Sequence, residues 1–272
     1  MPRKARLDAE LVRRGLARSR DHASELIGEG KVTVRGMAAS KPATGVDPGE
    51  AIVVKDTDDP GWASRGAHKL LGALAAFEPE GLTVTGRRCL DAGASTGGFT
   101  DVLLRAGAAT VVAADVGRGL LDWRLRTDDR VVVLDKTNVR ALTVEQIGGP
   151  VDLVVADLSF ISLRLVLPAL AACADAGADL VPMVKPQFEV GKDRLGSGGV
   201  VRDPELRVAA VRDVLTSATG LGLRPRGVVA SPLPGPSGNV EYFAWLSRSS
   251  ERQAGADEVE RLVRTAVREG PS

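Results

Sequence analysis

Short apolar runs alternate with longer segments of helical spacing over most of this 272-residue chain. The runs are rich in valine and predict strands, and the segments between them predict amphipathic helices. Regular alternation of this kind is typical of a doubly wound, mostly parallel sheet with helices on both faces. The predicted strands span 87–91, 110–115, 130–134, 151–157, 179–185, 224–231 and 240–247, the last of them antiparallel. The predicted helices lie near 66–77, 97–107, 118–126, 143–147, 161–174 and 204–220, with a charged helical tail over 253–270.

The first part of the chain follows a different pattern. Its predicted elements are helices over 8–16 and 20–28, the second capped by Ser19, and strands over 31–36 and 51–54. The acidic, turn-forming stretch at 56–61 separates this part from the rest. We therefore expect a small domain over residues 1–58, a linker over 59–63 and a larger α/β domain over 64–272.

Charge is distributed unevenly between these parts. Residues 1–46 hold ten Lys and Arg against five Asp and Glu, whereas the formal net charge of the whole chain is only +1. A basic head on a slightly acidic body favours contact with a polyanion. Two histidines and two cysteines without ligand spacing argue against a metal site. No signal peptide or membrane span is predicted, so we expect a cytoplasmic protein with free thiols.

A glycine-containing turn between a predicted strand and a predicted helix indicates a cofactor site. Gly93 and Gly97 bound this turn, and Asp115 ends the next apolar run about twenty residues later, where a nucleotide site holds its ribose. The spacing matches neither a dinucleotide fingerprint nor a P-loop. A loop of this length suits S-adenosylmethionine, with a tight turn that binds nothing as the alternative. The residues expected at the cofactor are Gly93, Ala94, Ser95, Thr96, Gly97 and Asp115, and less strongly Asp135.

Charged residues follow the predicted strands at the edge where α/β sheets bind ligands. Asp157 ends the fourth strand, Lys185 ends the fifth, and Glu241 opens the last. Lys69 lies on the helix before the first strand. Two lysines and two carboxylates that meet there would satisfy one another. We expect them to form a catalytic site, with a structural ion-pair network at the sheet edge as the alternative.

These four residues and their contexts carry a family resemblance. The contexts are Ser-Arg-Gly-Ala-x-Lys-Leu at Lys69, Val-Lys-Pro-Gln-Phe-Glu at Lys185 and Asn-Val-Glu-Tyr-Phe at Glu241. They resemble the Lys-Asp-Lys-Glu tetrad of the FtsJ-like RNA ribose 2′-O-methyltransferases. The head resembles the S4 RNA-binding fold through Arg6-Leu7-Asp8, Arg18-Ser19-Arg20 and Gly30-Lys31-Val32-x-Val34-x-Gly36. The whole chain is similar to the TlyA family of hemolysin-named rRNA methyltransferases.

The resemblance implies an S-adenosylmethionine-dependent enzyme that methylates cytidines in 16S and 23S ribosomal RNA. Our hypothesis for the four residues is that neutral Lys185 takes the proton from the ribose 2′-hydroxyl and that Asp157 and Glu241 orient and tune the lysines. Lys69 helps to hold the hydroxyl in line with the methyl group, and no metal is required. The residues expected against RNA phosphates are Arg3, Lys4, Arg6, Arg18, Arg20 and Lys41. The linker carries no basic residue, so any positive contact that family linkers make there is in doubt.

Three other functions compete with this interpretation. A pseudouridine synthase would use an Arg-Leu-Asp motif, but the only copy lies in the first predicted helix, away from any catalytic sheet. A membrane-active hemolysin needs an amphipathic or spanning segment that the sequence lacks. A ribosome-binding factor with an inactive methylase fold would not need the intact tetrad. Which nucleotides are modified, and the oligomeric state, do not follow from the sequence.

Overall fold

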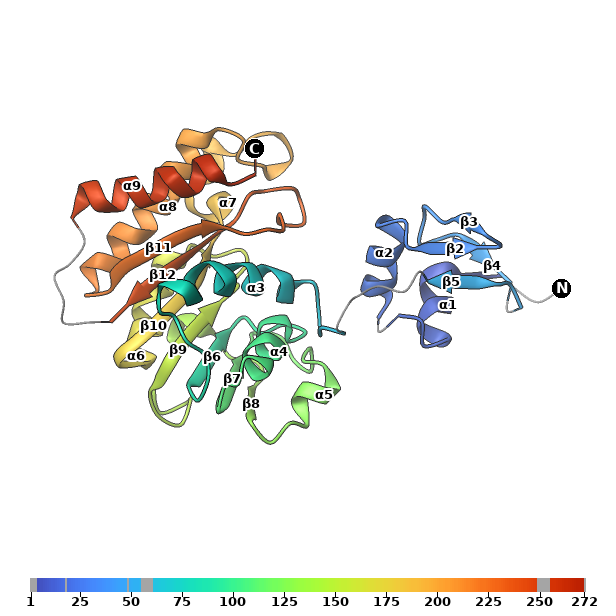
Figure 1. Cartoon of the computed structure of the whole chain (residues 1–272), viewed down its shortest axis with the longest axis horizontal. Coiled ribbons are helices and arrows are strands. Elements are labelled where there is room, and N and C mark those ends of the chain that lie inside the picture. The colour runs from blue at the N-terminus through green and yellow to red at the C-terminus, as the bar shows by residue number, and fades with distance from the viewer. Residues whose placement is uncertain (1–3, 18, 48, 55–60, 249–254, 272) are drawn as a thin grey trace. The chain divides into compact units, whose positions relative to one another are not determined.

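The computed structural model describes residues 4–17, 19–47, 49–54, 61–248 and 255–271. The chain divides into two compact units, Met1–Gly61 and Trp62–Ser272 (Figure 1). The division between them falls inside the predicted linker over 59–63. Each unit has its own buried apolar core.

The smaller unit packs two helices against short strands. Its elements are β1 Ala5–Arg6, α1 Leu7–Arg13, α2 Arg20–Gly28, β2 Val32–Val34, β3 Met37–Ala38, β4 Gly45–Val46 and β5 Ile52–Val54. Strand β2 pairs antiparallel with β3 and β5, and β1 pairs with β4. The predicted cap is present, because Ser19 Oγ accepts the His22 N–H at 3.1 Å. Helix α1 ends before the predicted Leu16, because Gly15 adopts a left-handed backbone with φ of 70°.

The larger unit is built on a seven-stranded sheet in the order β11-β12-β10-β9-β6-β7-β8 (Figure 1). Its strands are β6 Arg88–Ala92, β7 Thr110–Ala114, β8 Val131–Leu134, β9 Val151–Ala156, β10 Ala174–Val184, β11 Arg224–Ala230 and β12 Tyr242–Ser247. All seven match predicted strands. The last strand is antiparallel to both neighbours, as expected, and lies between β10 and β11.

Helices cover both faces of this sheet, and successive strand residues point to opposite faces. The helices are α3 Gly66–Phe77, α4 Gly98–Arg105, α5 Trp123–Arg126, α6 Leu167–Cys173, α7 Pro186–Glu189, α8 Pro204–Gly220 and α9 Ala256–Glu269. On β9, Leu153 and Val155 pack with α3 and α4, whereas Val154 and Ala156 pack with α6 and α8. Burial on both faces explains why the strands read as nearly continuous apolar runs.

Three predicted helices differ from the structure. The helix predicted over 118–126 is reduced to α5, and the one over 161–174 to the 3-10 turn Leu163–Leu165 and α6. The segment 143–147 forms turns rather than a helix. Gly148 and Gly149 both have positive φ, of 74° and 121°, and end that segment after a single turn.

Candidate active site

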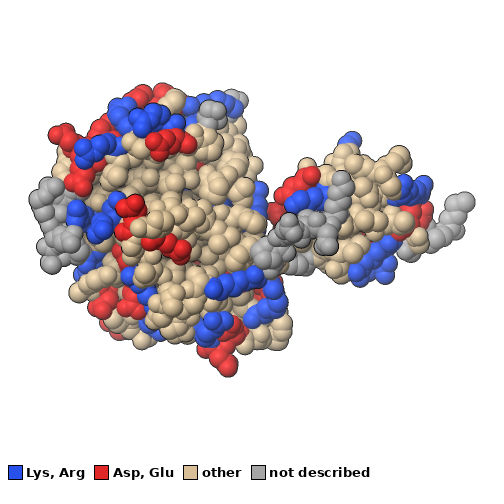
Figure 2. All heavy atoms as spheres, in the orientation of Figure 1, with Lys and Arg blue, Asp and Glu red and all other residues tan. Residues whose placement is uncertain are grey.

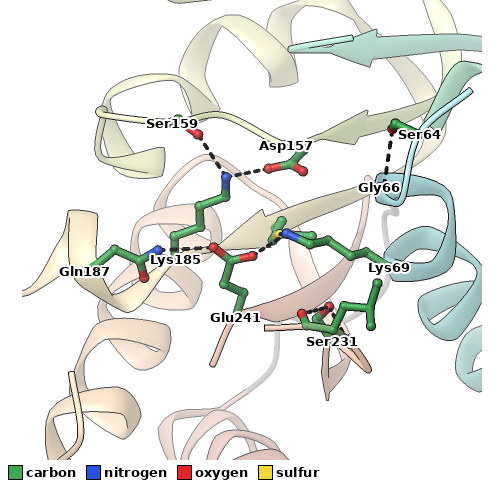
Figure 3. Close-up of polar contacts among 11 residues, drawn as sticks. Ser64, Gly66, Lys69, Asp157, Ser159, Lys185, Gln187, Ser231 and Glu241 are labelled. Carbon is green, nitrogen blue, oxygen red and sulfur yellow. Dashed lines mark hydrogen bonds and ion pairs between the residues drawn. The ribbon is translucent and has the colours of Figure 1, made fainter. Parts of the chain in front are cut away.

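The sheet register brings the predicted catalytic residues to one edge. Ala156 of β9 pairs with Ala92 of β6 and Pro182 of β10, so the carboxyl ends of these parallel strands lie together. Strand β12 runs in the opposite direction, and for that reason its start rather than its end reaches this edge. Asp157, Lys185 and Glu241 all leave the sheet there, as Figure 3 shows.

Two short ion pairs connect the four predicted catalytic residues. Lys185 Nζ lies 2.5 Å from Asp157 Oδ1, and Lys69 Nζ, from the first turns of α3, lies 2.6 Å from Glu241 Oε2 (Figure 3). Both lysines and Glu241 are buried, and Asp157 is partly exposed. Each buried positive charge therefore has a negative partner, which offsets the free-energy cost of removing it from water.

Two neutral side chains fix the geometry of these pairs. Ser159 Oγ accepts a hydrogen bond from Lys185 Nζ at 3.1 Å, and Gln187 Nε2 donates to Glu241 Oε1 at 3.1 Å (Figure 3). Gln187 follows Lys185 by two residues, so the amide connects the segment that carries Lys185 to the Glu241 pair. A carboxylate held from both sides and a lysine held by two oxygens have little freedom to rotate.

The predicted cofactor loop has the close packing that a backbone cradle requires. Gly93 and Gly97 have φ of 88° and 97°. A Cβ at Gly93 would lie 2.6 Å from the Asp157 carbonyl oxygen, and one at Gly97 would lie 2.3 Å from a Leu125 methyl carbon. Both positions therefore require glycine for backbone conformation and for space. The loop is shaped so that its backbone runs against the edge where Asp157 lies.

Asp115 closes the other side of this loop. Its Oδ2 accepts the Ser95 N–H at 2.8 Å, and its Oδ1 accepts the Gly117 N–H at 2.7 Å. Each carboxylate oxygen has a second lone pair that can accept from a hydroxyl. Ser95 and Thr96 are exposed and Ala94 is buried in the adjoining core. The residues present therefore fit a ligand that carries a pair of ribose hydroxyls.

The weaker prediction, Asp135, has a different environment. Its Oδ2 accepts from Arg126 at 2.9 Å and its Oδ1 accepts the Gly119 N–H at 3.2 Å. The Arg126 hydrogen bond, followed by the Gly119 amide, holds the pKa of this carboxyl below its usual range. Asp135 is thus a fixed anion on the segment after β8, and a contact with adenine stays a prediction.

A buried carboxyl that the sequence did not single out lies beneath the loop. Asp91, near the end of β6, is fully buried, and its Oδ2 accepts from Thr100 Oγ1 at 2.7 Å. Its Oδ1 is buried without a hydrogen-bond partner. Burial, and to a smaller degree the nearby Asp157 and Asp115 charges, raises the pKa of Asp91 to about 7.

The predicted phosphate contacts of the smaller unit are only partly free to meet RNA. Arg6 and Arg20 both bind the buried Asp8, each with a nitrogen 2.9 Å from Oδ2. These bonds hold the Asp8 pKa well below its usual range, the Arg6 bond contributing most. Lys4 and Lys41 are exposed, whereas Arg3 and Arg18 lie outside the described residues. Figure 2 shows Lys and Arg at several places on the visible face of this unit, some beside Asp or Glu.

Comparisons with known proteins agree with both units. The family model for FtsJ-like methyltransferases matches residues 62–248, and the model for the S4 domain matches residues 5–52. A Mycobacterium tuberculosis H37Rv protein named 16S/23S rRNA (cytidine-2′-O)-methyltransferase TlyA is 62% identical over 271 residues, covering 100% of both chains. The chain belongs to the TlyA family of FtsJ-like methyltransferases. This confirms the predicted family and fold class.

Other TlyA-family relatives carry a different name. Hemolysin A of Brachyspira hyodysenteriae is 34% identical over 240 residues, which is 88% of this chain and 98% of that one. A hemolysin-named structure from Streptococcus thermophilus has a TM-score of 0.76 at 36% identity and covers 99% of this chain and 98% of its own. Among the described residues, none of the helices is long and apolar enough to cross a membrane. The hemolysin alternative is not favoured, because the full-length relative at 62% identity is named an rRNA (cytidine-2′-O)-methyltransferase and the FtsJ-like model matches residues 62–248.

Sequence reasoning missed several contacts at this TlyA-family site. Gln187 belongs to the Val-Lys-Pro-Gln-Phe-Glu context of Lys185, and Ser159 lies two residues beyond Asp157, but neither was assigned a contact at the site. Gly235 makes room for Glu241, because a Cβ there would lie 2.6 Å from Glu241 Oε1. Asp91 lies two residues before the predicted cofactor loop, and its burial follows from the packing of α4 on β6.

Proposed function

We propose that this TlyA-family chain transfers a methyl group from S-adenosylmethionine to the ribose 2′-hydroxyl of cytidines in 16S and 23S ribosomal RNA. The observation that carries the proposal is the pair of buried lysine–carboxylate contacts beside a glycine cradle at one sheet edge. The family and the name of the 62% identical relative support the substrate. S-adenosylmethionine, when bound, supplies a methyl group on a positively charged sulfur.

The loop from Gly93 to Gly97 and Asp115 are the residues that would hold this cofactor. Gly93 and Gly97 let the backbone approach closely, and Asp115 accepts from ribose hydroxyls with its remaining lone pairs. Asp91 is fully buried beneath the same loop, and its Oδ1 has no hydrogen-bond partner. Its proposed role is to support the loop through its hydrogen bond with Thr100 Oγ1 of α4.

Lys185 is the proposed proton acceptor. In its neutral form, Nζ takes the proton from the 2′-hydroxyl and becomes an ammonium that stays beside Asp157 and Ser159. Asp157 therefore stabilises the charge that Lys185 acquires, and Ser159 keeps Nζ from rotating away. A positioned base of this kind contributes about 10²–10⁴-fold to the rate.

Lys69 is the proposed positioning cation for the ribose. Its ammonium is held by Glu241, which Gln187 holds from the other side. An ammonium has three donors, and Lys69 uses two of them on Glu241 Oε2 and Met183 Sδ, so one N–H group remains for the attacking oxygen. Alignment of that oxygen with the methyl group supplies much of the remaining rate.

The smaller unit is the proposed RNA anchor. Lys4, Lys41 and the exposed guanidinium groups of Arg6 and Arg20 would contact phosphates, as would Arg3 and Arg18. Asp8 fixes the direction of two of these groups, and one carboxylate shared by two arginines leaves a net positive charge. Such contacts make RNA binding fall steeply with salt concentration.

The test compares two substitutions of Lys185 in single-turnover methylation of ribosomal subunits. Lys185→Arg keeps a cation for Asp157 but cannot become neutral near physiological pH, whereas Lys185→Ala removes both properties. If Lys185 is the base, both variants lose at least about 10²-fold in rate while cofactor and RNA still bind. Activity in Lys185→Arg near that of the wild type would show that the pair only supports structure.

A further inference from the structure

A second buried carboxylate, outside the four predicted residues, joins two segments of the active site. Glu189 is the last residue of α7 and is 6% exposed. Its Oε1 accepts the Leu163 N–H at 2.6 Å, and its Oε2 accepts from Ser162 Oγ at 2.6 Å. Arg164 Nε lies 3.3 Å from the same Oε2. A buried carboxylate is retained only where such donors compensate its desolvation, and here three consecutive residues supply them.

The three residues that carry these donors, 162–164, lie at the end of the loop that begins at Asp157. The loop follows β9 and carries Asp157 and Ser159, both of which contact Lys185 Nζ. Glu189 belongs to the neighbouring segment, which begins at Lys185. The two segments are therefore connected at two points, by Lys185 at the start of the loop and by Glu189 at its end. The connection through Glu189 does not involve Lys185 Nζ.

The loop between these two connections has a strained backbone. Phe160 has φ of 62°, a left-handed conformation that is unfavourable for a bulky residue and persists only where the surroundings fix it. Its ring centroid lies 5.3 Å from that of Phe188, the residue before Glu189. Phe160 itself is 92% exposed, so burial of its side chain does not hold this conformation. Leu163, at the far end of the loop, also packs in the core, so release of Glu189 would remove the polar attachment of that end and leave the apolar one.

We propose that Glu189 is a positioning residue that keeps Asp157 and Ser159 in contact with Lys185. The inference rests on the proposed function, because it assigns to Glu189 the alignment of the base in that reaction. Glu189 touches neither Lys185 nor the cofactor loop in any described contact. Its loss should therefore lower the rate of the chemical step and leave the affinities for cofactor and RNA unchanged.

The experiment measures kcat, KM for ribosomal subunits, cofactor affinity by calorimetry and Tm for the full chain. Glu189→Ala should lower kcat by about 10²-fold, the loss expected when a reacting group moves by about 1 Å. Glu189→Gln keeps an acceptor oxygen for one donor and should recover part of kcat. Asp179→Asn is the matched control, because Asp179 is also buried and accepts from Arg87 at 2.6 Å and Trp245 at 2.7 Å, away from the site. The control should lower Tm without changing kcat per folded molecule.

The possible results separate this inference from the function on which it rests. A wild-type chain that transfers no methyl group to 2′-oxygen would refute the proposed function. An active wild type with unchanged kcat in both Glu189 variants would refute the positioning role alone. The positioning role would also be refuted if Glu189→Gln lost no more kcat than Asp179→Asn when the two variants have equal Tm. If Glu189→Ala does not fold, the Glu189→Gln comparison decides the question.

Discussion

The raised pKa of Asp91, beneath the proposed cofactor loop, gives a quantitative prediction of how stability changes with pH. Its pKa of about 7 lies roughly three pH units above that of a carboxyl in an unfolded chain, because burial disfavours the anion. The folded protein therefore binds this proton more tightly than the unfolded chain does. The stability that protonated Asp91 provides is complete below about pH 4 and is lost as the pH rises through about 7. At about 1.4 kcal/mol for each pH unit, the loss is on the order of 4 kcal/mol.

The Asp91→Asn substitution removes this titration and keeps an acceptor for Thr100 Oγ1. The free energy of unfolding of the variant, minus that of the wild type, should therefore increase as the pH rises from 5 to 8. Urea denaturation followed by tryptophan fluorescence measures it in the larger unit alone, because Trp62, Trp123 and Trp245 all belong to that unit. Subtracting the two curves cancels the contribution of titrating groups that do not interact with Asp91. A difference that stays constant from pH 5 to pH 8 would refute the assignment of a raised pKa.

Three further experiments test other parts of the structure. Asp115→Ala should greatly weaken S-adenosylmethionine binding in calorimetry, and unchanged affinity in a folded variant would remove Asp115 from the site. Deleting residues 1–60 should leave cofactor binding intact and sharply reduce the affinity for ribosomal subunits at low salt. Equal affinity in the truncated and full chains would show that the smaller unit does not anchor RNA. Gly235→Ala should displace Glu241 and lower the methylation rate, although glycine has no reactive group. Gly220→Ala is its control, because a Cβ there meets nothing within 4 Å, and equal rates in the two variants would contradict the clash.

The strands and the position of the site could be predicted from the sequence for the same physical reason. Parallel strands buried on both faces form continuous apolar runs, and the polar residue that ends such a run must lie at the ligand-binding edge. Asp157 and Lys185 were identified in this way. Glu241 required the further expectation that the last strand runs antiparallel, which the register with β10 confirms.

Contacts between loops could not be predicted, because they depend on how distant segments pack. The sequence does not say which lysine meets which carboxylate, nor that Glu189 binds residues 162–164. Charge counting likewise identified Arg6 and Arg20 as cations without showing that Asp8 binds both. A buried carboxylate binds the cations beside it and so limits their other contacts. Whether a carboxylate is buried depends on the whole fold.

The position of β12 has a consequence for the order in which the protein can assemble during synthesis. Strand β11 emerges from the ribosome before β12, yet it has no place in the sheet until β12 has paired with β10. Until then, the β10 edge is open, and an open edge is prone to pair with other chains. The same late strand is preceded directly by Glu241, the partner of Lys69. Closure of the sheet and completion of the site therefore both depend on the same strand, β12.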